Sequence, residues 1–146
     1  MGRPKKTALV FSLLLFVWFL FDITGLSLGK TIFVVSALKD EPIDLAMLIV
    51  YAISVGTFIC FEKIGKWFLL FVVAFWTFIQ GSMYFAASFD GYYNFFANEG
   101  THQIFPANQF FLVKDTYHVV LDLLILAAFV SLAVFIAMSI KNKERS

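Results

Sequence analysis

The sequence predicts an all-α membrane protein, an antiparallel bundle of four transmembrane helices with a long aromatic outer loop. Hydrophobic residues make up 61% of the 146 residues, charged residues make up 14%, and the mean hydropathy is +0.87. Soluble domains carry about 25% charged residues, and a chain of this length has too small an interior to bury such an apolar excess. Four apolar segments are each long enough to cross a bilayer.

These segments divide one domain, residues 1–146, into spans and loops. Continuous apolar runs favour helices over a membrane β-barrel, whose strands would alternate in polarity. Acidic residues interrupt only the first and the fourth segment, at Asp22 and Asp122. We therefore expect helices at about 8–28, 45–61, 67–88 and 117–140, with outer loops at 29–44 and 89–116.

The first segment has two features of a cleaved signal peptide, a basic start at 3–6 and small residues at Ser27 and Gly29. Its apolar stretch is long for a signal peptide and contains Asp22, so we interpret it as a retained helix. In the loop that follows, the β-branched run 31–35 predicts a short interfacial strand or turn. Pro42 then marks the start of the second helix.

The basic residues predict the orientation, because cytoplasmic loops carry an excess of Lys and Arg. With the N-terminus inside, the outer side holds only Lys30, Lys39 and Lys114. The cytoplasmic side then holds most of the basic residues, namely Arg3, Lys5, Lys6, Lys63, Lys66, Lys141, Lys143 and Arg145. We expect a multi-pass protein of the cell membrane with both termini cytoplasmic.

The second outer loop is too rich in aromatic residues for a disordered segment. Two interpretations remain open for this loop. Its rings anchor it among lipid headgroups, as aromatic belts do, or they form a lid over an outward-facing pocket. The aromatic residues are Phe89, Tyr92, Tyr93, Phe95, Phe96, Phe105, Phe110 and Phe111.

Polar side chains recur at one depth of the predicted membrane, about 7–9 Å inside its outer boundary. Ionisable groups within a span are costly and usually face protein or water. His118 and Asp122 also share one helix face. Two interpretations remain open: hydrogen bonds that only fix helix register, or a site for a proton, a cation or a polar headgroup. The candidate cluster is Asp22, Tyr51, Gln80, His118 and Asp122.

The fourth helix has a second face that predicts contact with protein. Ala127 and Ser131 form a small-xxx-small pair, which lets helices approach closely. We expect this face to meet a neighbouring helix, a second copy of the chain or a larger membrane protein.

Other kinds of site find little support in the sequence. It has no zinc-site pattern, no phosphate loop and no nucleophile elbow. Net charge is +1, which argues against nucleic-acid binding. We predict no metal and no cofactor, and Asp115 is expected to lie at the positive end of the fourth helix dipole.

In size and layout the chain resembles small bacterial membrane proteins, including DoxX-like ones, without a shared motif. We expect an accessory or scaffold subunit of a membrane assembly, and not an enzyme. One alternative is a small oligomeric transporter coupled to protons or cations through Asp22 and Asp122. A second alternative is a membrane enzyme that acts on lipid at the outer interface with His118 as a base beside Asp122.

Overall fold

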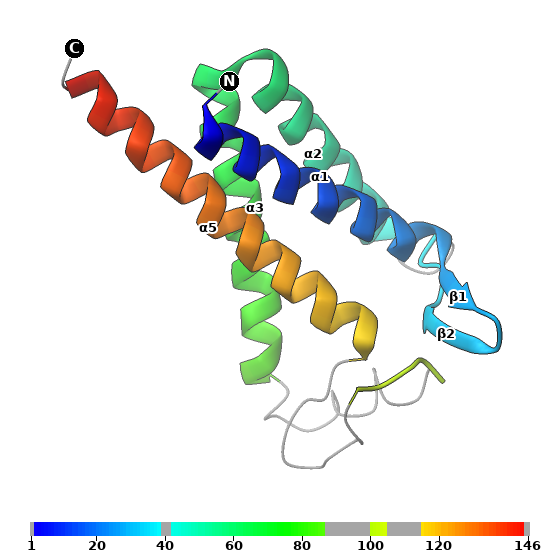
Figure 1. Ribbon diagram of the computed structural model, residues 1–146. Helices are drawn as coiled ribbons and strands as arrows, with labels where there is room; N and C mark the ends of the chain where they lie inside the picture. The colour runs from blue at the N-terminus through cyan, green and yellow to red at the C-terminus, as the bar shows by residue number, and fades with distance from the viewer. Residues whose placement is uncertain (1, 39–41, 87–99, 105–114, 145–146) are drawn as a thin grey trace.

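The computed structural model describes residues 2–38, 42–86, 100–104 and 115–144. Within these ranges four helices are long and apolar enough to span a membrane, which confirms that part of the predicted fold class. The helices and a two-stranded sheet follow one another as α1 (Arg3–Thr24), β1 (Leu26–Leu28), β2 (Thr31–Val34), α2 (Pro42–Cys60), α3 (Glu62–Ala86) and α5 (Thr116–Glu144) (Figure 1).

The four helices surround one apolar core. α1 packs against α2 and α5, and α3 packs against the same two helices. Figure 1 shows the N-terminus, the α2–α3 turn and the C-terminal end of α5 at one end of the molecule, with the β-hairpin and the start of α5 at the other. Side chains from all four helices are fully buried between them, among them Leu15, Phe58, Leu69, Ile125 and Leu132.

The first helix ends four residues earlier than predicted. α1 stops at Thr24, and Gly25 then takes a φ of +80°, a conformation that favours glycine. Leu26–Leu28 forms β1, which pairs antiparallel with β2 at Thr31–Val34. The prediction of helix to residue 28 is therefore wrong, and the segment 31–35, expected as a short strand or turn, contains the strand β2. α1 also begins earlier than expected, at Arg3, because Pro4 fits the first turn of a helix.

The connection between α2 and α3 is also tighter than predicted. The third helix was expected from residue 67 but begins at Glu62, so residues 62–66 are its first turn and not a loop. Phe61 marks the change of direction: its N–H donates to the Thr57 carbonyl, and its own carbonyl accepts from Gly65. Glu62 and Lys63 are exposed and Lys66 is half-buried, and all three belong to the helix.

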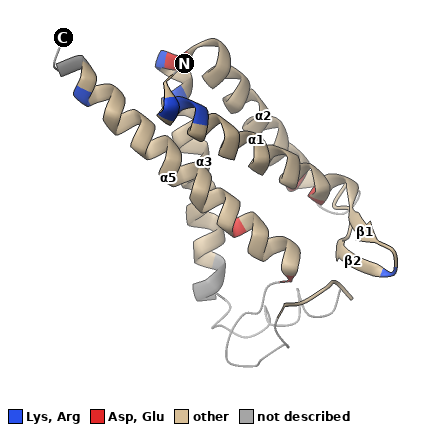
Figure 2. Cartoon of the chain, viewed as in Figure 1, with Lys and Arg blue, Asp and Glu red and all other residues tan. Residues whose placement is uncertain are grey.

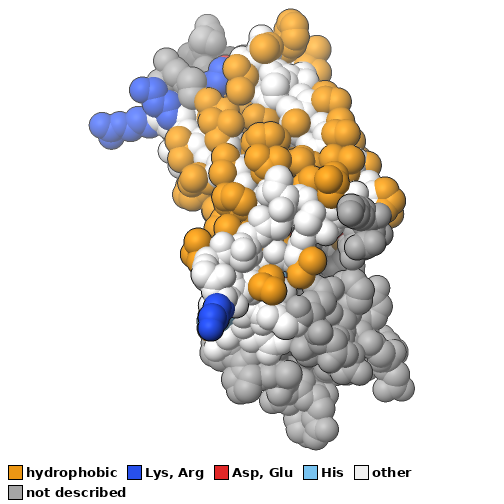
Figure 3. Space-filling view, turned by 90° about the vertical axis from the view of Figure 1, so that its right-hand side faces the viewer, with side chains coloured by type: hydrophobic (Ala, Val, Ile, Leu, Met, Phe, Trp, Pro, Cys, Tyr) orange, Lys and Arg blue, Asp and Glu red, His pale blue; other side chains and the backbone are white. Residues whose placement is uncertain are grey.

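The outside of the helices is apolar. Figure 3 shows hydrophobic side chains spread over the helical part of one face. Large hydrophobic side chains are exposed on every one of these helices, for example Val17, Ile53, Phe78 and Leu123. A surface of this kind needs lipid around it, so the chain is a multi-pass membrane protein.

Charged side chains gather toward the two ends of the helices. Figure 2 shows Lys and Arg mainly at the end that carries the N-terminus and the α2–α3 turn. At the opposite end the described residues include Lys30 in the β-hairpin and three acidic residues, Asp22, Asp44 and Asp115.

Candidate functional site

Two aromatic residues join α1 to α5 near the end that carries the β-hairpin. The Trp18 Nε1–H donates to the Tyr117 carbonyl at 3.1 Å, and the Tyr117 hydroxyl donates to the Trp18 carbonyl, also at 3.1 Å. Their rings stack with centroids 5.5 Å apart. Tyr117 is fully buried. This reciprocal pair fixes how the start of α5 sits against α1.

Asp115 caps the N-terminus of α5. Its Oδ1 accepts the backbone N–H of His118 at 2.9 Å and lies 2.8 Å from the His118 Nδ1. The Asp115 side chain is only 1% exposed. Burial alone would raise the pKa of Asp115, but the hydrogen bonds and the charge of His118 outweigh burial and hold that pKa below its ordinary value of 3.8. A carboxylate at this position also complements the helix dipole.

A short extended segment, residues 101–104, ties this cap to the β-hairpin. The His102 backbone N–H donates to the Ile32 carbonyl at 2.7 Å, and the His102 carbonyl accepts the Thr116 N–H at 2.9 Å. The His102 Nδ1 lies 2.7 Å from the Thr116 hydroxyl. The buried Thr101 hydroxyl approaches the Asp115 carboxyl without a hydrogen bond of ordinary geometry in the described part of the chain.

Asp22 lies in the same region, on α1 one turn after Trp18. It is 8% exposed, and its backbone carbonyl accepts the N–H of Ala37 after the β-hairpin. The Tyr117 side chain lies within electrostatic range of Asp22, Asp44 and Asp115. Three carboxyl groups from three parts of the chain therefore act electrostatically on this side chain at the start of α5.

The structure places Tyr51 apart from this region. Its hydroxyl donates to the Ser12 carbonyl at 2.9 Å, and its ring contacts Trp76. Ser12 precedes Asp22 by ten residues of α1, which corresponds to about 15 Å along the helix. The Tyr51 hydroxyl thus takes part in a contact between α1 and α2 deeper in the bundle.

The other members of the predicted cluster occupy half-buried positions. Gln80 lies on α3, and His118 and Asp122 lie one turn apart on α5; all three have interaction partners. The carboxylate that holds the His118 Nδ1 is that of Asp115, at the preceding turn. Helix spacing in the sequence pairs His118 with Asp122. An Asp at the N-cap that accepts the backbone N–H three residues later points instead to Asp115.

Ala127 and Ser131 lie half-buried on α5. Both line a groove of about 480 Å³ between α5 and the first half of α1, together with Thr7 and Phe11. Their small side chains leave this groove open along the side of α5. The groove begins near the N-terminus of the chain, at Arg3 and Pro4.

The aromatic residues of the predicted outer loop, from Phe89 to Phe111, lie outside the described residues. Among the residues that the structure does describe, no group of three His, Cys, Asp or Glu side chains is placed to hold a metal ion. No protein-family model, curated protein or solved structure matches this chain.

Proposed function

We propose that the chain serves as a scaffold or accessory subunit of a membrane assembly, in the cell membrane and with both termini cytoplasmic. The orientation rests on the basic residues at the end that carries the N-terminus and the α2–α3 turn. The role rests on one observation, the filled space between the helices. Leu15, Phe58, Leu69 and Ile125 are buried there, each less than about 2% exposed.

Several polar groups within the spans support the same role, because they form hydrogen bonds with the helix backbone. The Tyr51 hydroxyl donates to Ser12, and the Ser12 and Ser54 hydroxyls donate to carbonyls of their own helices. His118 and Asp115 together cap α5. Such contacts fix the register of helices in a bundle, whereas a transport pathway needs polar groups that face water.

An exposed aromatic row on α3 is the surface we assign to a membrane partner. Its four side chains recur every three or four residues, which places them on one side of the helix. Phe71 and Phe75 stack on each other with centroids 6.4 Å apart, so that part of the row is ordered. The row consists of Trp67, Phe71, Phe75 and Phe78, each about half exposed or more.

The role is tested by the size of the complex that the chain forms in its own membrane. In mild detergent we expect a complex larger than the chain with its lipids, and we expect the double variant Phe71→Ala/Phe75→Ala to reduce it. Leu126→Ala is the control, since Leu126 is also about half exposed but lies on α5. A complex unchanged in the double variant would contradict this surface.

A measurement of uptake into vesicles distinguishes the transport alternative from the scaffold role. Purified chain in vesicles is expected to drive no uptake coupled to protons or cations. Uptake by the parent chain that is lost in Asp22→Asn or Asp122→Asn, with the size of the complex unchanged, would overturn the scaffold role in favour of transport. Asp22 is the sharper of the two positions, because it is buried within a span.

A further inference from the structure

Two hollows adjoin each other between α1 and α5 at the basic end of the molecule. The groove described above measures about 480 Å³ and runs along Thr7, Phe11 and Ser131. The second hollow measures about 450 Å³ and lies beside the last turns of α5. Pro4 lines both. The two hollows therefore adjoin at Pro4, one at the helix ends and the other extending toward the middle of the bundle.

The groove changes from cationic to apolar along its length. Arg3 stands at its mouth, and Phe11 lies eight residues further along α1, about 12 Å deeper. Across from Phe11 the wall consists of small or aliphatic side chains of α5. A positive charge at one end of an apolar groove of this length matches the charge and shape of a phospholipid.

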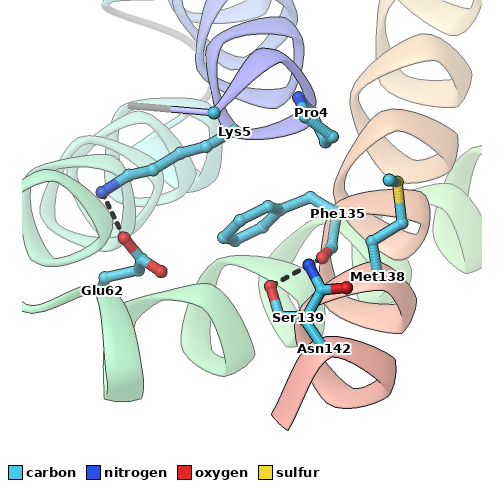
Figure 4. A pocket seen from close by; sticks show the side chains of 8 residues that line it. Pro4, Lys5, Glu62, Phe135, Met138, Ser139 and Asn142 are labelled. Carbon is cyan, nitrogen blue, oxygen red and sulfur yellow. Dashed lines mark hydrogen bonds and ion pairs between the residues drawn. The ribbon is translucent and has the colours of Figure 1, made fainter. Parts of the chain in front are cut away.

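The basic residues near the two hollows differ in whether an acidic side chain already neutralises them. Lys5 points toward Glu62, and the two form an ion pair with N and O 2.5 Å apart (Figure 4). The charge of Lys5 is therefore largely neutralised by Glu62. Arg3 has no acidic partner in the described part of the chain, and Lys6 is its neighbour one turn on along α1.

The start of α1 adds a further preference for an anion. Gly2 at its N-cap has no side chain to bind the free N–H groups, and the first turn has no acidic residue. The positive end of the helix dipole is thus left without a negative partner from its own first turn. This end of α1 lies at the same mouth of the groove as Arg3.

We propose that this groove binds an anionic phospholipid of the cytoplasmic leaflet. The phosphate lies at Arg3 and the free N–H groups at the start of α1, and one acyl chain lies along Phe11, Ser131 and Val134. Basic pockets between membrane helices on the cytoplasmic side bind anionic headgroups in this way. The leaflet rests on the orientation proposed above, while the groove itself does not depend on a partner protein.

The test measures lipids retained by the purified chain in native mass spectrometry. Phosphatidylglycerol and phosphatidylcholine with identical acyl chains are added in turn, and the parent chain is expected to prefer phosphatidylglycerol. A basic residue near a membrane surface contributes about 1 kcal/mol, so Arg3→Gln should reduce this preference about fivefold. Lys63→Gln is the matched control: it removes one charge at the same end, outside the groove.

Filling the groove tests the position of the acyl chain. Ser131→Leu fills it from α5 and Thr7→Phe fills it from α1, and each should reduce retention of both lipids. Ala137→Leu adds the same bulk as Ser131→Leu at an exposed position of α5 outside the groove and should leave retention unchanged. Because the two filling variants lie on different helices, a folding defect in one leaves the other informative.

Three results would overturn the proposal. These are equal retention of the two lipids by the parent chain, equal effects of Arg3→Gln and Lys63→Gln, or unchanged retention in both filling variants. None of them bears on the scaffold role, because the measurement uses the chain without partners. Conversely, a chain that forms no larger complex in its membrane can still show the full lipid preference.

Discussion

Asp115 combines burial with charge at the start of α5. The residue is almost inaccessible to solvent, yet hydrogen bonds from His118 lower its pKa below the ordinary value. One oxygen of its carboxylate accepts both the backbone N–H and the ring nitrogen of His118, so this oxygen orders the first turn of the helix. The segment 101–104 and the β-hairpin attach to the same turn, so the cap anchors more than one helix.

The contribution of this cap is measurable by substitution. Asp115→Ala should lower the free energy of unfolding by about 1–2 kcal/mol, because it removes the N-cap acceptor of the half-buried His118 N–H. Asp115→Asn keeps an acceptor at the N-cap and should lose less. The measurement is denaturation in detergent followed by circular dichroism.

The same residue predicts a dependence on pH. A carboxyl group whose pKa is lower in the folded than in the unfolded state stabilises the fold above the unfolded pKa, and this stability is lost as the pH falls through the folded pKa. The parent chain should therefore lose stability below about pH 4, while Asp115→Asn should lose less over that range. Equal acid sensitivity of both chains would contradict the role of the carboxylate charge.

Individual side chains were the least predictable part of the site. The depth of Asp22 in the membrane follows from its position in an apolar run, and the residue is indeed buried. The partner of the Tyr51 hydroxyl does not follow, because it depends on how α2 is rotated against α1. The Trp18–Tyr117 pair has the same cause: two backbone carbonyls accept hydrogen bonds that helical spacing alone does not indicate.

The helices were predictable in their middles and less so at their ends. A continuous apolar run of about 20 residues has one low-energy form in a bilayer, because helices satisfy every backbone group within the segment. At the end of α1 an apolar run no longer predicts helix, because Leu26 and Leu28 are apolar but lie beyond the helix. A short apolar run does not separate helix from strand, and here pairing with β2 decides the outcome.

The α2–α3 hairpin depends on a close approach of two backbones. Gly65 is buried where the start of α3 meets the end of α2. A Cβ atom at this position would lie 2.4 Å from the backbone N and Cα of Phe58. No side-chain movement relieves a contact with backbone, so the two helices would have to separate.

Gly65→Ala should therefore destabilise the fold by about 3 kcal/mol, at the upper end of ordinary overpacking. Gly56→Ala is the matched control in α2, because a Cβ there meets nothing within 4 Å. Alanine at that site should be neutral or stabilising by up to about 1 kcal/mol, since it favours helix over glycine. Denaturation midpoints in detergent measure both variants, and a parent-like midpoint for Gly65→Ala would show that the helices can part at little cost.

The whole molecule carries its charges asymmetrically. The basic residues of α1 and of the α2–α3 turn lie at one end, where Lys5 and Glu62 also link α1 to α3. The acidic residues near the start of α5 lie at the other end, beside the β-hairpin. With the proposed orientation, this asymmetry of charge would place the groove between α1 and α5 in the cytoplasmic leaflet, so both proposals depend on the orientation.

Two lysines at opposite ends test the orientation. Lys30 lies in the turn of the β-hairpin after α1, and Lys63 lies at the start of α3 after α2; both are exposed. In a Cys60→Ala background, which removes the one native cysteine, Lys30→Cys should react in intact cells with a maleimide that does not cross membranes. Lys63→Cys should react only after the membrane is opened.

The two labelling positions test separately whether α2 crosses the membrane and in which direction the chain is inserted. One span lies between Lys30 and Lys63, so the two positions face opposite sides whichever way the chain is inserted. Labelling of both from the same side would contradict the membrane path of α2 itself. An exchanged pattern would keep the spans and reverse the direction, and the lipid groove would then face the outer leaflet with its cationic mouth and apolar channel unchanged.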